Sequence, residues 1–154
     1  KDIGRIYIQY FDMMLGLTLG YPASLCVHAP TCGRGLALEH NGDLYCCDHF
    51  VDPEHFLGNI TNASLESMVD SHFQLAFGQN KSATLPDVCR GCQFLTYCFG
   101  GCPKDRLIVT DSGKLNWLCL GYKAFYKETA PYFKAMATCL RQRLPASEYR
   151  RFLK

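Results

Sequence analysis

The feature that most constrains this chain is a run of closely spaced cysteines, Cys89-x2-Cys92-x5-Cys98-x3-Cys102, followed directly by Pro103. Two thiolates separated by two residues grip one metal ion, or one edge of a cluster, from a single turn of backbone. Glycines stand beside several of these cysteines, and their small size leaves backbone amides free to hydrogen-bond to sulfur. The run therefore predicts a metal or cluster site.

The total number of cysteines also points to chemistry. The chain has 154 residues and ten cysteines, with 48% apolar and 19% charged residues, which is the composition of a globular protein. A domain of this size buries a sufficient core without covalent crosslinks. Thiols that are not needed for stability indicate a chemical role.

The charge balance argues against a nucleic-acid binder, because the formal net charge is only +2. The charge is unevenly distributed, since residues 120–154 contain eight Lys or Arg and two Glu. Two interpretations of this basic segment stay open, a solvated helix face and a docking surface for an acidic partner.

Membrane insertion and export are not expected. The longest apolar stretch, from Met13 to Val27, is interrupted by Gly16, Gly20 and Pro22 and is shorter than the ~20 residues that a membrane helix needs. The first residues also lack the pattern of a signal peptide. We therefore expect a cytoplasmic protein, in which disulfides are rare.

Strand signals are concentrated in the N-terminal third. The β-rich run from Ile3 to Tyr10 predicts a strand, and the Gly- and Pro-containing residues 12–25 predict a loop. Two apolar segments that flank Asn41-Gly42 within residues 36–47 predict a β-hairpin, because both turn residues tolerate positive φ.

Helix signals follow. Asn62 is a candidate N-cap for a helix with apolar residues at Leu65, Met68, Val69 and Phe73, and Gly78 is expected to end it. Residues 80–101 lack periodicity and are expected to form a cysteine-rich loop. Apolar spacing then predicts one helix that stops before Pro131 and a second from Pro131 to about Leu144.

Three ligation schemes are compatible with the cysteines. Disulfides require an oxidising compartment that the sequence does not indicate. Structural zinc requires four ligands around one ion, but the chain has only one C-x2-C knuckle. The third scheme is iron–sulfur, because the Cys98-x3-Cys102-Pro103 tail is similar to the end of the bacterial ferredoxin run, where the cysteine before proline binds the other cluster.

In the iron–sulfur scheme, Cys102 is separated from its three predecessors in the run. Those three need a fourth ligand, and Cys119 is the next cysteine downstream. Cys102 needs three companions, for which Cys26, Cys32 and either Cys46 or Cys47 are available.

The cysteines and the short sequence motifs around them also match the pattern of a known family. The matching motifs are Cys26-x5-Cys32-Gly33-x-Gly35, Cys32-x9-Gly42-x4-Cys47, Asn41-Gly42-Asp43, Cys47-Asp48, Cys89-x2-Cys92-x5-Cys98-x3-Cys102-x16-Cys119 and Gly100-Gly101-Cys102-Pro103-Lys104-Asp105-Arg106. This pattern resembles the SPASM domain, a twin-cluster extension of certain radical S-adenosylmethionine enzymes, and most closely its anaerobic sulfatase-maturating branch. The resemblance extends from about Ile6 to Tyr126.

The resemblance implies two auxiliary 4Fe-4S clusters and an α+β fold, with a small β-hairpin followed by cysteine-rich loops and C-terminal helices wrapped around the clusters. It implies that one cluster is held by the first set, Cys26, Cys32, Cys47 and Cys102. It implies that the other is held by the second set, Cys89, Cys92, Cys98 and Cys119. Cys46 and Cys139 lie outside the motif and are expected to be small buried hydrophobes.

In that branch, a radical from S-adenosylmethionine takes a hydrogen from the β-carbon of a sulfatase Cys or Ser, which becomes formylglycine. The resemblance implies that Asp48 is the base, a role that suits a carboxylate whose pKa is raised by burial. Among the five histidines, only His49 is a candidate site residue, because it is next to Asp48 in the sequence. The expected partners are an unfolded sulfatase peptide and an electron carrier such as flavodoxin or ferredoxin.

The motif that binds the radical-generating cluster, C-x3-C-x2-C, does not occur in this sequence. The resemblance therefore implies that S-adenosylmethionine and a third 4Fe-4S cluster bind in a preceding domain. Residues 1–12 are interpreted as the last strand of that barrel, residues 13–154 as the SPASM domain, and the chain alone as inactive. Two alternatives remain open, another peptide-modifying enzyme of the same kind and a zinc-bound structural module, with zinc also possible as an adventitious substitute for iron.

Overall fold

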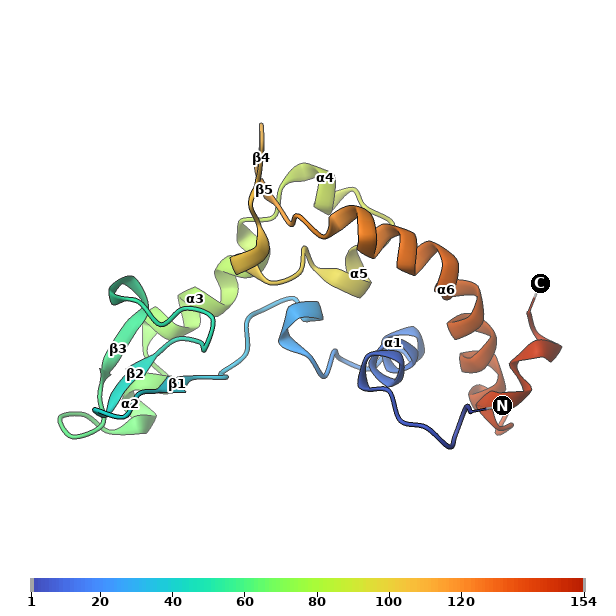
Figure 1. Ribbon diagram of the computed structural model, residues 1–154, viewed down its shortest axis with the longest axis horizontal. Coiled ribbons are helices and arrows are strands. Elements are labelled where there is room, and N and C mark those ends of the chain that lie inside the picture. The colour runs from blue at the N-terminus through green and yellow to red at the C-terminus, as the bar shows by residue number, and fades with distance from the viewer. Residues whose placement is uncertain (1, 154) are drawn as a thin grey trace.

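The computed structural model describes residues 2–153 as an arch, with a small sheet at one end and a long helix along the other side (Figure 1). The α-helices are α1 (Gln9–Leu19), α2 (Leu65–Val69), α3 (His72–Ala83), α4 (Asp87–Arg90), α5 (Leu95–Cys98) and α6 (Cys119–Arg141). The strands are β1 (Ala37–Leu38), β2 (Asp43–Tyr45), β3 (Phe56–Asn59), β4 (Ile108–Thr110) and β5 (Gly113–Leu115). Short 3-10 helices are η1 (Cys26–His28), η2 (Pro53–His55), η3 (Pro103–Asp105) and η4 (Ala146–Arg151). The mixture of helices and small sheets agrees with the expected α+β class.

The hairpin predicted around Asn41-Gly42 is confirmed, although its strands are short. β1 and β2 pair antiparallel, and Gly42 adopts a φ of 89° in the turn between them. A third antiparallel strand, β3, which the sequence did not indicate, completes the sheet. Asn59 from β3 fastens the turn, because its Nδ2 donates to the carbonyl of Asn41 at 3.0 Å and to Oδ1 of Asp43 at 2.9 Å.

The N-terminal expectation of a strand followed by a loop is wrong, because α1 occupies much of this segment. Met13 and Met14 on α1 are buried in one core cluster with Tyr126 and Phe133 of α6. Packing against α6 stabilises a helix here that local propensity does not indicate. Gly20, with a φ of 96°, ends the helix in the left-handed conformation that glycine adopts without strain. The expected domain boundary at residue 12 falls inside α1.

The single helix expected after Asn62 is two helices, because serine caps interrupt it. Ser64 caps α2 by accepting from the backbone N–H of Ser67, and Ser71 caps α3 by accepting from that of Gln74. Gly78 lies inside α3 and does not end it. The helix thus continues into the segment that was expected to be a loop.

The two helices expected around Pro131 are one continuous helix, α6, with this proline inside it. Proline removes one intrahelical hydrogen bond and usually breaks or kinks a helix. Here Tyr126 and Phe133, on either side of the proline in sequence, are both buried against α1. We infer that this shared packing offsets the local cost of the proline.

The cysteine-rich region between α3 and α6 is built from the short helices α4 and α5, η3 and the β4–β5 hairpin, which projects from the top of the arch (Figure 1). None of the helices in residues 2–153 is both long and apolar enough to cross a membrane.

Candidate metal centre

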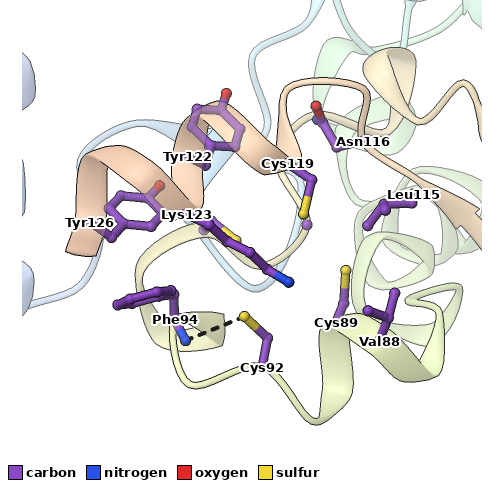
Figure 2. Close-up of a pocket in the computed structure, with 12 residues that line it drawn as sticks. Val88, Cys89, Cys92, Phe94, Leu115, Asn116, Cys119, Tyr122, Lys123 and Tyr126 are labelled. Atoms are coloured by element: carbon purple, nitrogen blue, oxygen red, sulfur yellow. Dashed lines mark hydrogen bonds between the residues drawn. The ribbon is translucent and has the colours of Figure 1, made fainter. Parts of the chain in front are cut away.

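The second set of cysteines surrounds one pocket. Cys89 lies on α4, Cys92 follows that helix, Cys98 ends α5 and Cys119 begins α6. All four line one pocket. Figure 2 shows the sulfur atoms of Cys89, Cys92 and Cys119 directed toward the same space. Three helices, α4, α5 and α6, and the residues just after α4 thus direct these four cysteines to one pocket.

The wall of this pocket is largely apolar. Val88, Leu115, Phe94 and Tyr126 contribute to it, and the side chain of Lys123 reaches into the same region from α6 (Figure 2). The backbone N–H of Phe94 lies 3.5 Å from the sulfur of Cys92, within hydrogen-bond distance for sulfur.

Burial affects the thiols of this set. Burial raises the pKa of Cys89 and of Cys98, and for Cys98 the backbone N–H of Gly100 acts in the opposite direction by donating to sulfur. Neighbouring cysteines raise these pKa values further, and those neighbours are the other members of the same set. A bound cation would favour the thiolates, because burial alone penalises them.

The first set comes from distant parts of the chain. Cys26 begins η1, Cys32 lies in the following loop, Cys47 follows β2 and Cys102 immediately precedes η3. Burial raises the pKa of Cys32, Cys47 and Cys102, to about 11 for Cys47, and the charge interactions among these thiols run within the set. The assignment of these four cysteines to one site stays a prediction.

The loop from Cys26 to Cys32 is fastened to α3. The backbone N–H of Cys32 donates to the carbonyl of Gly78 at 3.0 Å. The ammonium group of Lys81 donates to the carbonyls of Cys26 at 2.5 Å and of Ala29 at 2.6 Å. These contacts position two of the four thiols of the first set.

Asp48 and His49 contact the first set, but Asp48 is not buried. The thiol of Cys47 donates to Oδ1 of Asp48 at 3.2 Å, and Nδ1 of His49 lies 3.3 Å from the sulfur of Cys102. The Cys47 hydrogen bond holds the pKa of Asp48 below its usual range. The expectation that burial raises this pKa is wrong for the chain as described, because the side chain is exposed to solvent.

The two remaining cysteines, Cys46 and Cys139, have 0% exposed surface. Burial raises the pKa of Cys46 to about 11. The expectation that both are small buried side chains is confirmed.

Two buried cations were not anticipated from the sequence. Lys81 is 1% exposed and Arg106 is 5% exposed. Lys81 lies at the start of the segment expected to be a loop, and nothing in its local pattern indicates burial. Arg106 is the last residue of the Gly100–Arg106 motif, and arginine side chains are mostly exposed.

The thiols of the second set fit an iron–sulfur cluster by their number and chemistry, because four of them line one pocket and four cysteine thiolates are the usual ligands of such a cluster. Within residues 2–153, no group of three or more His, Cys, Asp or Glu side chains is arranged around a single ion.

Comparisons with known proteins agree with this chemistry. Residues 26–93 match the SPASM family, described as an iron-sulfur cluster-binding domain. The chain is 41% identical over 150 residues to a serine-type anaerobic sulfatase-maturating enzyme from Bacteroides thetaiotaomicron, covering 96% of this chain and 36% of that relative. It is 30% identical over 128 residues to a cysteine-type anaerobic sulfatase-maturating enzyme from Clostridium perfringens, covering 82% of this chain and 34% of that relative. The chain thus spans about a third of the length of these relatives.

Solved structures give the same result. The structure of native anSMEcpe with bound AdoMet and Cp18Cys peptide superposes with a TM-score of 0.76 at 29% identity, covering 88% of this chain and 38% of that one. The structure of the same protein with AdoMet and a Kp18Cys peptide superposes with a TM-score of 0.75. Residues 26–93 thus match the SPASM iron–sulfur class, and the chain as a whole is homologous to part of the anaerobic sulfatase-maturating enzymes.

Proposed function

We propose that this chain is the auxiliary-cluster portion of a radical S-adenosylmethionine enzyme that oxidises a sulfatase Cys or Ser to formylglycine. The observation that supports this most directly is the pocket lined by the four thiols of the second set, Cys89, Cys92, Cys98 and Cys119. Homology to serine-type and cysteine-type maturases supports the same reaction class.

The eight thiols are assigned to two cluster sites. In this proposal Cys26, Cys32, Cys47 and Cys102 hold one 4Fe-4S cluster, and Cys89, Cys92, Cys98 and Cys119 hold the other. When bound, such clusters supply one-electron transfer. Four cysteine ligands complete the coordination of a cluster, so the thiols favour passage of the substrate electron over direct coordination of the substrate.

The remainder of the activity is assigned to a preceding domain, which would bind S-adenosylmethionine and a third 4Fe-4S cluster. We place the start of the auxiliary-cluster portion at α1 rather than at residue 13, because α1 packs against α6 and shares its core. The partners proposed for the whole enzyme are an unfolded sulfatase peptide and a small electron carrier such as flavodoxin or ferredoxin. Alone, this chain is expected to be inactive.

The test is a measurement of iron, acid-labile sulfide and zinc per chain after purification and reconstitution without oxygen. Roughly eight iron and eight sulfide per chain are expected, with a brown colour that bleaches on reduction. About two zinc ions and no iron under these conditions would replace the proposal with a structural zinc module. Zinc from an aerobic preparation does not decide between the two, because tetrahedral sulfur sites accept both metals.

Asp48 is proposed as the base that accepts the substrate proton in the whole enzyme. The family resemblance supports this role, and the proximity of Asp48 to Cys47 places the carboxylate beside the first set. In this proposal the ionised carboxylate of Asp48 accepts the proton.

The variant Asp48→Asn tests this role. In the whole enzyme we expect turnover to fall by about 10²–10⁴-fold, the usual contribution of general acid–base catalysis, while iron content stays at the wild-type value. Asp52→Asn is the matched control, because Asp52 is a nearby carboxylate that instead pairs with His55. Equal turnover in Asp48→Asn and the wild type would remove the assignment.

A further inference from the structure

Lys81 and Arg106 are buried in a region that offers them no carboxylate. Within residues 2–153, neither side chain has an Asp or Glu oxygen within ion-pair distance, and the four ion pairs found there involve other residues. Burying a cation is costly unless an anion or several hydrogen bonds compensate for the lost water. The burial of these two cations therefore needs an explanation.

Backbone carbonyls satisfy part of this requirement. Lys81 donates to two carbonyls of the Cys26–Cys32 loop. Arg106 donates to the carbonyls of Phe99 at 3.1 Å and of Gly100 at 3.4 Å, and to the hydroxyl of Thr84 at 3.2 Å. These bonds fix the two cations in place, but they supply no negative charge.

Cysteine thiols act on both cations. Burial lowers the pKa of Lys81, the thiols of Cys32, Cys26 and Cys102 act against that change, and the guanidinium of Arg106 adds to it. Burial also lowers the pKa of Arg106, and Cys89, Cys32, Cys102 and Cys98 act against it. Lys81 also donates to the carbonyl of Cys26 and so lies beside the first set, whereas Arg106 donates to the carbonyls of Phe99 and Gly100, between Cys98 and Cys102 in the chain.

The Arg106 side chain contacts the backbone segment that joins Cys98 of the second set to Cys102 of the first. Gly100 has a φ of 73°, and a Cβ added there would come within 3.0 Å of the Arg106 guanidinium and 2.5 Å of the Leu85 side chain. Gly100 stands between Cys98 of the second set and Cys102 of the first. The guanidinium thus packs directly on the short segment that joins the two sites.

We propose that Lys81 and Arg106 are fixed counter-charges for the two iron–sulfur sites, which raise the reduction potentials of the clusters and favour their acceptance of an electron. The inference rests on the proposed function, because it requires clusters at both sets. Four thiolates leave a cluster with net negative charge, and reduction adds one more. A buried cation stabilises the reduced state more than the oxidised state, because little water screens the interaction.

The positions of the two cations give this proposal a specific pattern. Replacing Lys81 should make the potential of the first cluster more negative, with a smaller change at the second. Replacing Arg106 should make both potentials more negative. No such pattern is expected if these side chains only fill space or hold backbone carbonyls.

The experiment is a potentiometric titration of the reconstituted protein, followed by electron paramagnetic resonance. Lys81→Met keeps the length of the side chain and removes its charge, and Arg106→Gln removes charge while keeping a donor. Lys114→Met is the matched control, because this lysine is exposed on β5 and its charge is screened by solvent. Single-cluster variants Cys32→Ala and Cys119→Ala assign each signal to its set.

The proposal is supported if Lys81→Met and Arg106→Gln give more negative potentials in the stated pattern and Lys114→Met gives wild-type values. Unchanged potentials in both charge-removing variants would overturn it. If Arg106→Gln binds less iron, Arg106→Lys decides: full iron with a wild-type potential supports a charge role, and the same loss of iron overturns it in favour of a structural one. Absence of iron from the wild type would instead reject the proposed function itself.

Discussion

The two cysteine sets differ in how the chain assembles them. The second set spans residues 89–119 and uses the ends of three helices around one cavity. The first set joins residues as far apart as Cys26 and Cys102, and its loop is held in place by contacts with α3. Local assembly costs little loop-closure entropy, whereas the first set depends on the correct docking of several segments.

The surroundings of the sets differ as well. Cys98, Phe94 and Tyr122 of the second site also pack against the α1–α6 core, so this site adjoins the largest hydrophobic cluster described. The first site adjoins the small sheet and α3, and it depends on hydrogen bonds to backbone carbonyls. We therefore expect the second site to form more readily and the first to be more sensitive to distant changes.

The largest expected effect follows removal of one ligand from each set. Cys119→Ala and Cys32→Ala should each lose roughly half of the iron and sulfide, because each variant removes one cluster of two. Iron and sulfide analysis after anaerobic reconstitution measures the loss. Cys139→Ala is the control for removal of a buried thiol outside both sets, and it should keep its iron. Complete loss of iron from Cys119→Ala would show that the sets do not form independently.

The next largest effects should follow from substitutions in the core near each site, which we expect to affect one site more than the other. Phe133→Ala, in the core cluster that also contains Tyr126 of the second site, should lower the free energy of unfolding by about 3–5 kcal/mol. Leu44→Ala, in the sheet near the first site, should cost about 2–5 kcal/mol. Denaturant unfolding measures the stability, and iron release to a chelator measures the effect on each site.

The two core variants should act on different clusters. We expect Phe133→Ala to speed iron release in the Cys32→Ala background, which keeps the second site, and Leu44→Ala to speed it in the Cys119→Ala background. Equal acceleration in both backgrounds would mean that the two regions unfold as one unit.

Sequence reasoning succeeded where the signal is local. The Asn41-Gly42 hairpin was predicted because the turn residues alone specify it. The pairing of the cysteines was predicted from spacing and family resemblance; the second set lines one pocket, and the pairing itself stays a prediction. α1 and the continuity of α6 through Pro131 were missed, because both depend on packing between segments more than a hundred residues apart. The burial of Lys81 was missed because it depends on contacts with the carbonyls of Cys26 and Ala29, which lie more than fifty residues earlier.

A smaller effect is expected at Gly78, where α3 meets the first site. A Cβ there would lie 3.0 Å from the carbonyl of Cys32. Overpacking of this kind costs about 1–3 kcal/mol, which opposes the gain of roughly 1 kcal/mol from replacing glycine in a helix. Gly78→Ala should therefore reduce iron at the first site while the second keeps its iron.

Gly121→Ala is the control for Gly78→Ala. Gly121 lies on α6, and nothing stands within 4 Å of an added Cβ. This variant should gain roughly 0.5–1 kcal/mol in stability and keep all of its iron. Full iron at the first site in Gly78→Ala would show that the Cys32 loop tolerates displacement, and that its docking on α3 is looser than proposed.

The smallest expected effect tests whether α3, and not its neighbour, positions the first site. Ser71 accepts from the backbone N–H of Gln74 at 3.1 Å, and removal of such a cap costs about 1 kcal/mol. Ser64→Ala removes the equivalent cap of α2, where Ser64 accepts from Ser67 at 3.2 Å, at a similar cost. Because α3 contributes both Gly78 and Lys81, Ser71→Ala should speed chelation of first-site iron and Ser64→Ala should not. Equal rates in the two variants would mean that the sheet and both helices hold the first site together, and that α3 has no special part in it.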